Sequence, residues 1–218
     1  MRKITKIIKG HSITASLFAF CLICILFVLS LLLCELRGIT PVFNEIDKKG
    51  PVIVFVAGLG EPWHETLTMT AQLFKNWNYA VFSWNQKQNI MDWLKQNSRR
   101  RLILIGHSLG AGTAVRVANE NASVTGLLIT LDPVGPMPSF SNALSNIPWV
   151  NVRGCGRSWN DFVAGCGGRW KTLPNYCLNV RSMRDHNAPY HMLRDMGLLK
   201  VNAFLLKLQN PPKAKRGE

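Results

Sequence analysis

The chain has 218 residues, of which 47% are hydrophobic and 17% are charged, so it can bury a core and is not a disordered, highly charged chain. Its 26 Lys and Arg residues against 12 Asp and Glu residues give a formal net charge of +14. Such a basic surface suits an anionic membrane, or it is simply a solvated face without a partner. The sequence has no nucleic-acid-binding motif, so we do not expect nucleic acid as a partner.

The N-terminal part of the chain predicts a membrane anchor. Residues 1–12 are basic, and residues 13–34 contain no charged side chain. As a helix this uncharged run would be about 33 Å long, enough to cross a hydrocarbon core of about 30 Å. The alternative is a cleaved signal peptide, whose apolar core is normally about 7–15 residues and ends at a small-residue cleavage site. We predict an uncleaved, single-pass anchor with a cytoplasmic N-terminus and the remaining chain on the extracytoplasmic side.

Beyond the anchor, the sequence predicts alternating strands and helices. A polar connection over residues 35–50 leads into the domain 51–210, and a basic tail over residues 211–218 follows it. Short β-branched apolar runs indicate buried strands, and apolar residues at helical spacing indicate helices. The predicted strands are 51–57, 79–83, 102–105, 127–131, 150–152 and 177–180, and the predicted helices are 63–77, 87–98, 109–119 and 189–208. This alternation predicts an α/β fold with a mostly parallel sheet covered on both faces.

A serine between two glycines stands where a predicted strand passes into a helix. Residues 106–110 read Gly-His-Ser-Leu-Gly. In this context the motif predicts a sharp turn that lifts the hydroxyl of Ser108 above the sheet edge as a nucleophile, and the glycines avoid collisions with neighbouring elements. The N–H of Leu109 is a predicted oxyanion donor, and the N–H of Leu59, in the loop after the first strand of the domain, is the second. The alternatives are an ordinary serine in a glycine-rich turn and a plain strand-ending turn at Leu59.

A serine nucleophile needs a base and a carboxylate that orients the base. Asp132 directly follows a predicted strand, which places it at the same sheet edge as Ser108, although an aspartate before proline can also open a turn. Two late histidines qualify as the base. His186 lies in the loop between the last strand and the last helix, and His191 lies in the first turn of that helix. The loop position favours His186.

These motifs resemble the lipase branch of the α/β-hydrolase superfamily. There a Gly-His-Ser-Leu-Gly motif and a Leu-Asp-Pro motif, here residues 106–110 and 131–133, carry the nucleophile and the acid. The resemblance implies the α/β-hydrolase fold and a triad of this serine, this aspartate and a late histidine. Its specific part is residues 102–136. The usual His-Gly of the first oxyanion loop is Ala57-Gly58 here, and the segment after Asp132 is short for a large lid.

Three cysteines lie in the last third of the chain, namely Cys155, Cys166 and Cys177. They allow at most one disulfide and leave its pairing open. In an oxidising compartment Cys155–Cys166 would be the candidate pair.

The sequence thus predicts a membrane-anchored serine hydrolase that cleaves carboxylic esters, of lipids or other acyl compounds, through an acyl-enzyme intermediate. This chemistry requires no metal and no cofactor. Residues 135–174 are irregular and rich in aromatic side chains, and we expect them to cross the mouth of the site and form an acyl pocket, or else to pack on the core. The alternative functions are a thioesterase or acyltransferase of the same fold and a non-catalytic, membrane-tethered interaction module.

Overall fold

The structure of the chain is a computed structural model. The residues that it describes are 38–195, except 48, 61–65 and 98–99, together with 21–23, 25, 26, 29 and 33.

The chain divides into two units, Met1–Arg37 and Gly38–Glu218. The described residues of the first unit are helical. None of the helices formed by described residues has the length and apolar character needed to cross a membrane. The predicted anchor, 13–34, lies mostly outside the described residues and stays a prediction.

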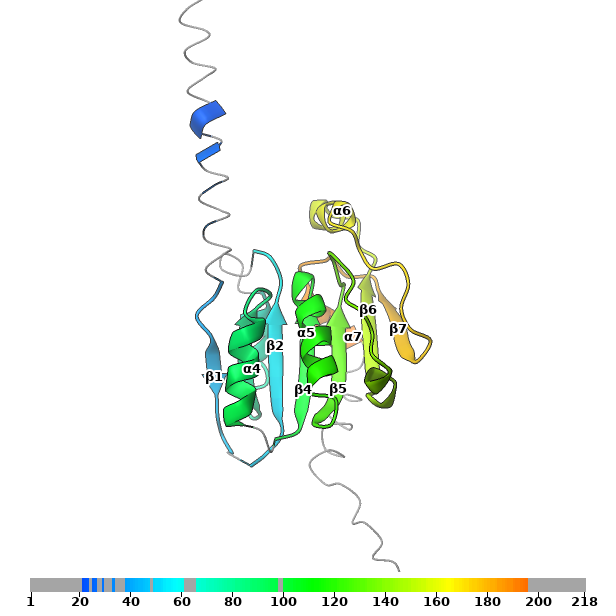
Figure 1. Ribbon diagram of the computed structural model, residues 1–218. Helices are drawn as coiled ribbons and strands as arrows, with labels where there is room; N and C mark the ends of the chain where they lie inside the picture. Colours follow the sequence, from blue (N-terminus) through cyan, green and yellow to red (C-terminus); the bar gives the residue numbers. More distant parts are fainter. Residues whose placement is uncertain are drawn as a thin grey trace, which may run out of the picture. The chain divides into compact units, whose positions relative to one another are not determined.

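The described residues of the second unit form a sheet of seven strands in the order β1-β3-β2-β4-β5-β6-β7 (Figure 1). Every neighbouring pair is parallel except β1 with β3. The strands are β1 (Val42–Asn44), β2 (Val52–Ala57), β3 (Asn78–Ser83), β4 (Leu102–His107), β5 (Thr125–Leu131), β6 (Trp149–Gly154) and β7 (Cys177–Ser182). The helices are α3 (Thr66–Gln72), α4 (Lys87–Gln96), α5 (Leu109–Glu120), α6 (Trp159–Cys166) and α7 (Pro189–Asp195), with a 3-10 helix η1 at Asn142–Asn146.

The central strands are buried because they are apolar and have helices on both faces. Every residue of β2, β3, β4 and β5 is buried. Along β2 the side chains alternate: Val54 joins the core beneath α4 and α5, and Phe55 joins the core beneath α3 and α7. Figure 1 shows α4 and α5 in front of the sheet and α7 behind it. The predicted α/β architecture, a mostly parallel sheet with helices on both faces, is confirmed.

Two elements depart from the sequence analysis. The segment 35–50, predicted as a polar connection, contains the short edge strand β1, whose Phe43 packs against Phe82 and Trp93. The irregular segment 135–174 contains a well-formed helix, α6. Strand β1 is too short to show a period, and α6 exposes its aromatic side chains, which hides the usual pattern of a core-facing helix.

The predicted helices 63–77 and 189–208 are described only in part. Helix α3 ends at Gln72 and is followed by turns, and residues 61–65 lie outside the described residues. Helix α7 begins at Pro189, as predicted, and is described as far as Asp195.

The candidate disulfide is not formed. Cys155, Cys166 and Cys177 are all unpaired thiols in the structure. Burial raises the pKa of Cys177 to about 12, so this thiol is uncharged at neutral pH.

Candidate active site

Ser108 stands at the sharp turn between β4 and α5. Its backbone has φ 53° and ψ −125°, a conformation that non-glycine residues rarely adopt. Hydrogen bonds hold it there: its N–H donates to Leu131 O at the end of β5 (3.0 Å), and its carbonyl accepts from the N–H groups of Ala111 and Val134. The side chain is buried at the carboxyl edge of the sheet.

The glycines around Ser108 allow close backbone approach. A Cβ at Gly106 would lie 2.6 Å from Ala111 Cα, and one at Gly110 would collide with the backbone carbonyl of Val56. Helix α5 can therefore pack directly on β2 and β4 only because both positions lack a side chain.

The hydroxyl of Ser108, the imidazole of His186 and the carboxylate of Asp132 lie in line. His186 Nε2 is 3.0 Å from Ser108 Oγ, and His186 Nδ1 is 2.6 Å from Asp132 Oδ2. All three residues are buried. With its Nδ1 proton donated to the carboxylate, the imidazole presents Nε2 as an acceptor to the serine hydroxyl.

The other late histidine is not part of this arrangement. His191 lies in α7, and no described residue hydrogen-bonds its buried Nδ1 atom. Of the two histidines that the sequence left in competition, the structure brings His186 to the serine.

The carboxylate of Asp132 is fully buried and has further donors. Its Oδ1 accepts from Gly154 N–H at 3.1 Å, and its Oδ2 accepts from Arg169 Nε at 3.0 Å and Arg169 Nη2 at 2.7 Å. The backbone N–H of Asp132 donates to Val152 O on β6. Four donors therefore fix the carboxylate in place, counting His186.

Arg169 is a residue of the site that the sequence pattern did not predict. Its guanidinium also donates to Asp161 Oδ1 on α6 at 2.6 Å, so one cation joins two buried carboxylates. Burial alone would raise the pKa of Asp161, but hydrogen bonds from Arg169 and Ser158 outweigh it and lower that pKa. Burial likewise opposes the charge of Arg169, while its bonds to Asp161 and Asp132 raise its pKa. Asp161 and Arg169 are therefore both charged at neutral pH. Contact between Arg169 and Asp132, 37 residues apart, has no local sequence signal.

The ring of His107 packs beside that of His186 and hydrogen-bonds the His186 backbone. Its Nε2 is 2.7 Å from the backbone carbonyl of His186, and the two rings are 4.9 Å apart. Burial, with a smaller contribution from nearby His186, lowers the pKa of His107 to about 4. The neutral ring must carry its proton on Nε2 to donate to the carbonyl. The sequence carries no local signal for this contact of His107, because its partner is 79 residues away.

The loop after β2 passes beside the serine hydroxyl. A Cβ at Gly58 would lie 2.6 Å from Ser108 Cβ and 3.2 Å from Ser108 Oγ, so this loop reaches the hydroxyl only with glycine there. Leu59 is the next residue, and Leu109 begins α5 directly after Ser108. The backbone segments that hold both predicted oxyanion donors therefore flank the serine.

The aromatic segment 135–174 divides into two parts. Phe140, Trp149 and Trp170 pack together on the core, as the alternative expectation had it, whereas Trp159 and Phe162 are exposed on α6. A pocket of about 430 Å³ lies elsewhere, between α3 and α7. Its lining includes Met69, Leu73, Asn187, Tyr190 and His191. Asn187, one of the lining residues, directly follows His186 in the chain.

Comparison with known proteins places the fold. No protein-family model matches the sequence, and no curated protein matches it. Among solved structures, Est1E from Butyrivibrio proteoclasticus superposes with a TM-score of 0.50 at 13% identity, covering 77% of this chain and 92% of that chain. A structure from work on LipS and LipT, two metagenome-derived lipolytic enzymes, gives a TM-score of 0.50 at 10% identity, covering 77% of this chain and 97% of that chain. At these identities the likeness shows a common fold.

Proposed function

Starting from the α/β-hydrolase fold that the chain shares with these structures, we propose that it is a serine hydrolase of carboxylic esters. The observation that carries the proposal is the line of contacts from Ser108 Oγ through His186 to Asp132, with distances of 3.0 Å and 2.6 Å. Fold likeness alone would not support an activity, because one fold hosts many functions.

The proposed reaction begins with attack of Ser108 Oγ on the acyl carbonyl, while His186 Nε2 takes the hydroxyl proton. The carbonyl oxygen becomes an oxyanion, which the N–H groups of Leu59 and Leu109 stabilise. As the tetrahedral intermediate collapses, His186 gives its proton to the departing alkoxide, so an alcohol leaves and an acyl-serine remains. Water then attacks the acyl-serine while His186 takes a proton from it, and His186 returns this proton to Ser108 Oγ as the carboxylic acid leaves.

Asp132 has two roles in this scheme. Its hydrogen bond to His186 Nδ1 fixes the tautomer that leaves Nε2 free to accept a proton, and its negative charge stabilises the imidazolium that forms. Because Arg169 and the Gly154 N–H also bind this carboxylate, it stays oriented throughout.

We propose an apolar acyl ester, such as a lipid ester, as substrate. The apolar pocket between α3 and α7, whose lining includes the residue after His186, offers room for an acyl chain. The uncharged run 13–34 would anchor the chain in a membrane with its N-terminus in the cytoplasm and the hydrolase domain outside it. This would hold the domain next to lipid substrates.

The test is covalent labelling of the full chain in detergent with a fluorophosphonate probe, which reacts with activated serines. We expect the wild type to be labelled, and Ser108→Ala and His186→Ala to lose labelling. His191→Ala is the matched control: it removes the other late histidine and should retain labelling. A folded wild type that resists the probe, or labelling that survives Ser108→Ala, would refute the proposal. Product analysis with added alcohols then separates hydrolysis from acyl transfer.

A further inference from the structure

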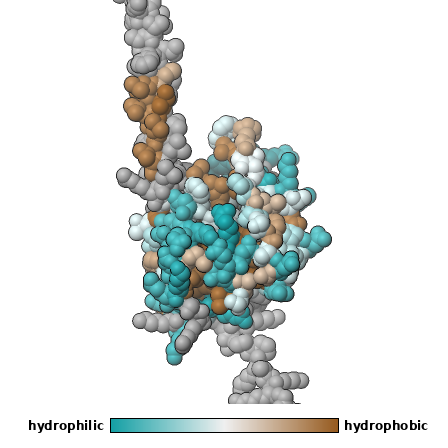
Figure 2. Space-filling model, viewed as in Figure 1, coloured by the Kyte–Doolittle hydropathy of each residue, from teal (hydrophilic) through white to brown (hydrophobic). Residues whose placement is uncertain are grey.

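Helix α6 exposes its large apolar side chains and buries a charged one, which is the reverse of an ordinary surface helix. Trp159, Phe162 and Val163 are 73%, 60% and 50% exposed, although they are its largest apolar side chains. The buried side chains of this helix are Asp161 and Ala164. A surface helix normally buries its apolar stripe and exposes its charges. Figure 2 shows the hydrophobic residues of α6 at the molecular surface.

This orientation is fixed by specific contacts. Ser158 forms a capping box with Asp161 at the start of the helix. Asp161 also binds Arg169, which in turn binds Asp132. The rings of Trp159 and Phe162 stack on each other with centroids 5.2 Å apart. The helix therefore presents a preformed aromatic surface, at the carboxyl edge of the sheet where Ser108 also lies (Figure 1).

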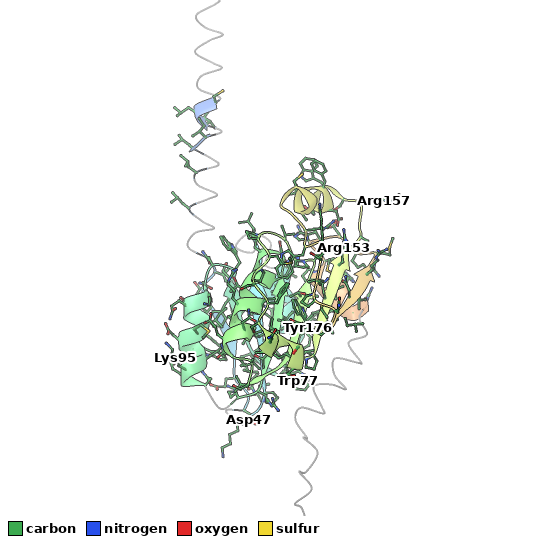
Figure 3. The ribbon with its side chains drawn as sticks, turned by 45° about the vertical axis from the view of Figure 1, so that its right-hand side comes forward. Asp47, Trp77, Lys95, Arg153, Arg157 and Tyr176 are labelled. Atoms are coloured by element: carbon green, nitrogen blue, oxygen red, sulfur yellow. The ribbon has the colours of Figure 1, made fainter. Side chains whose placement is uncertain are left out.

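The part of the chain that contains this aromatic surface is rich in basic residues. Residues 153–185 contain six Arg or Lys residues and two acidic residues, and one of the acidic residues, Asp161, is bound to Arg169. Arg153 and Arg157 are exposed, and Figure 3 shows both at the same end of the domain as α6. Met183, directly after β7, is 80% exposed and adds another apolar side chain.

We propose that α6 docks on the surface of an anionic lipid bilayer, with Trp159, Phe162 and Val163 entering the interface and Arg153 and Arg157 contacting lipid phosphates. Aromatic side chains favour the headgroup region, and each nearby Lys or Arg contributes about 1 kcal/mol at an anionic surface. A second copy of this chain fits less well, because it would bring two basic surfaces together.

The inference rests on the proposed function for its choice of partner, and it adds how the domain meets the membrane. Docking through α6 would turn the carboxyl edge of the sheet, and thus Ser108, towards the bilayer.

The test measures whether Trp159 meets lipid. The full chain is reconstituted in phosphatidylcholine vesicles with or without phosphatidylglycerol, and tryptophan emission is quenched with phosphatidylcholine brominated on its acyl chains. The contribution of Trp159 is the difference between wild type and Trp159→Phe. We expect this emission to shift to the blue and to be quenched when phosphatidylglycerol is present. Arg153→Gln with Arg157→Gln should reduce the quenching towards its value in phosphatidylcholine alone.

Trp77 is the matched control. It lies just before β3, at the opposite end of the strands, and Figure 3 shows it at the end of the domain away from Arg157. Its contribution, obtained from Trp77→Phe, should not be quenched. Quenching of neither tryptophan, or of both equally, would overturn the inference. The inference would also be overturned if Trp159 is not quenched, the wild type is a dimer, and Trp159→Asp dissociates that dimer. A second copy of the chain would then cover α6. Quenching needs no catalysis and probe labelling needs no vesicle, so this inference and the proposed function can fail separately.

Discussion

Two of the three side chains of the candidate triad stand on strained backbone. Ser108 has φ 53° and Asp132 has φ 41°, and in the described part of the chain no other non-glycine residue has a positive φ. Such conformations cost on the order of 1–3 kcal/mol each and persist only where their surroundings enforce them. Here the N–H of Ser108 is held by Leu131 O and that of Asp132 by Val152 O. The sheet edge thus sets the geometry of the site.

The residue His107 should make the free energy of unfolding of the chain depend on pH. Burial lowers its pKa to about 4, whereas in the unfolded chain it titrates near about 6.5. Between these values the unfolded chain binds a proton that the folded chain does not, so this contribution is complete above pH ~6.5 and is lost as pH falls. We expect the free energy of unfolding to fall by up to about 3 kcal/mol between pH ~6.5 and ~4 from this group.

The measurement is urea unfolding in detergent at about pH 7 and about pH 4.5, for the wild type and His107→Gln. The glutamine amide can still donate to His186 O but does not titrate in this range. The variant should therefore lose less stability on acidification than the wild type. Equal losses in the two proteins would show that His107 is not the group responsible.

Helix α5 packs closely on β2 at Gly110. We expect Gly110→Ala to destabilise the chain by several kcal/mol, because its Cβ would overlap the backbone carbonyl of Val56, which cannot move away without distorting β2. Gly112→Ala on the same helix is the control. Its Cβ would be at least 3.7 Å from every neighbour, and alanine in a helix is about 0.5–1 kcal/mol more stable than glycine. Thermal melts should therefore move in opposite directions, and similar melting temperatures for the two variants would contradict the packing argument.

The elements also show how far sequence can predict this structure. Strands β2 and β4 are continuous apolar runs with glycines at their ends, and such runs fix both the fold class and the position of Ser108. Helix α6 could not be predicted in the same way, because its apolar side chains face outward and its charged Asp161 faces inward. Arg169 and His107 escaped notice because their partners are distant in sequence and only the packed sheet brings them together.

At the scale of the whole chain, the predicted anchor over residues 13–34 can be tested by membrane fractionation. We expect the full chain to stay in the membrane fraction after alkaline carbonate washing. Leu26→Arg with Leu29→Arg should release it, because a charge at the centre of a spanning helix costs about 2.5–3.5 kcal/mol. Leu178→Arg, at an exposed position of β7, is the control and should not release the chain. A wild type that washes off would contradict the anchor and leave only surface association.

The ion pairs of Arg169 with Asp132 and Asp161 connect helix α6 to the candidate active site. Arg169 and α6 both come from the connection between β6 and β7, yet Arg169 supplies two of the four hydrogen bonds to Asp132. Replacing this connection with a short turn would keep the serine, the histidine and the aspartate. It would remove Arg169, the cation that binds the aspartate. A change in the segment that carries α6 therefore also affects the triad at the sheet edge. The exposed helix and the triad cannot be exchanged between proteins as independent parts.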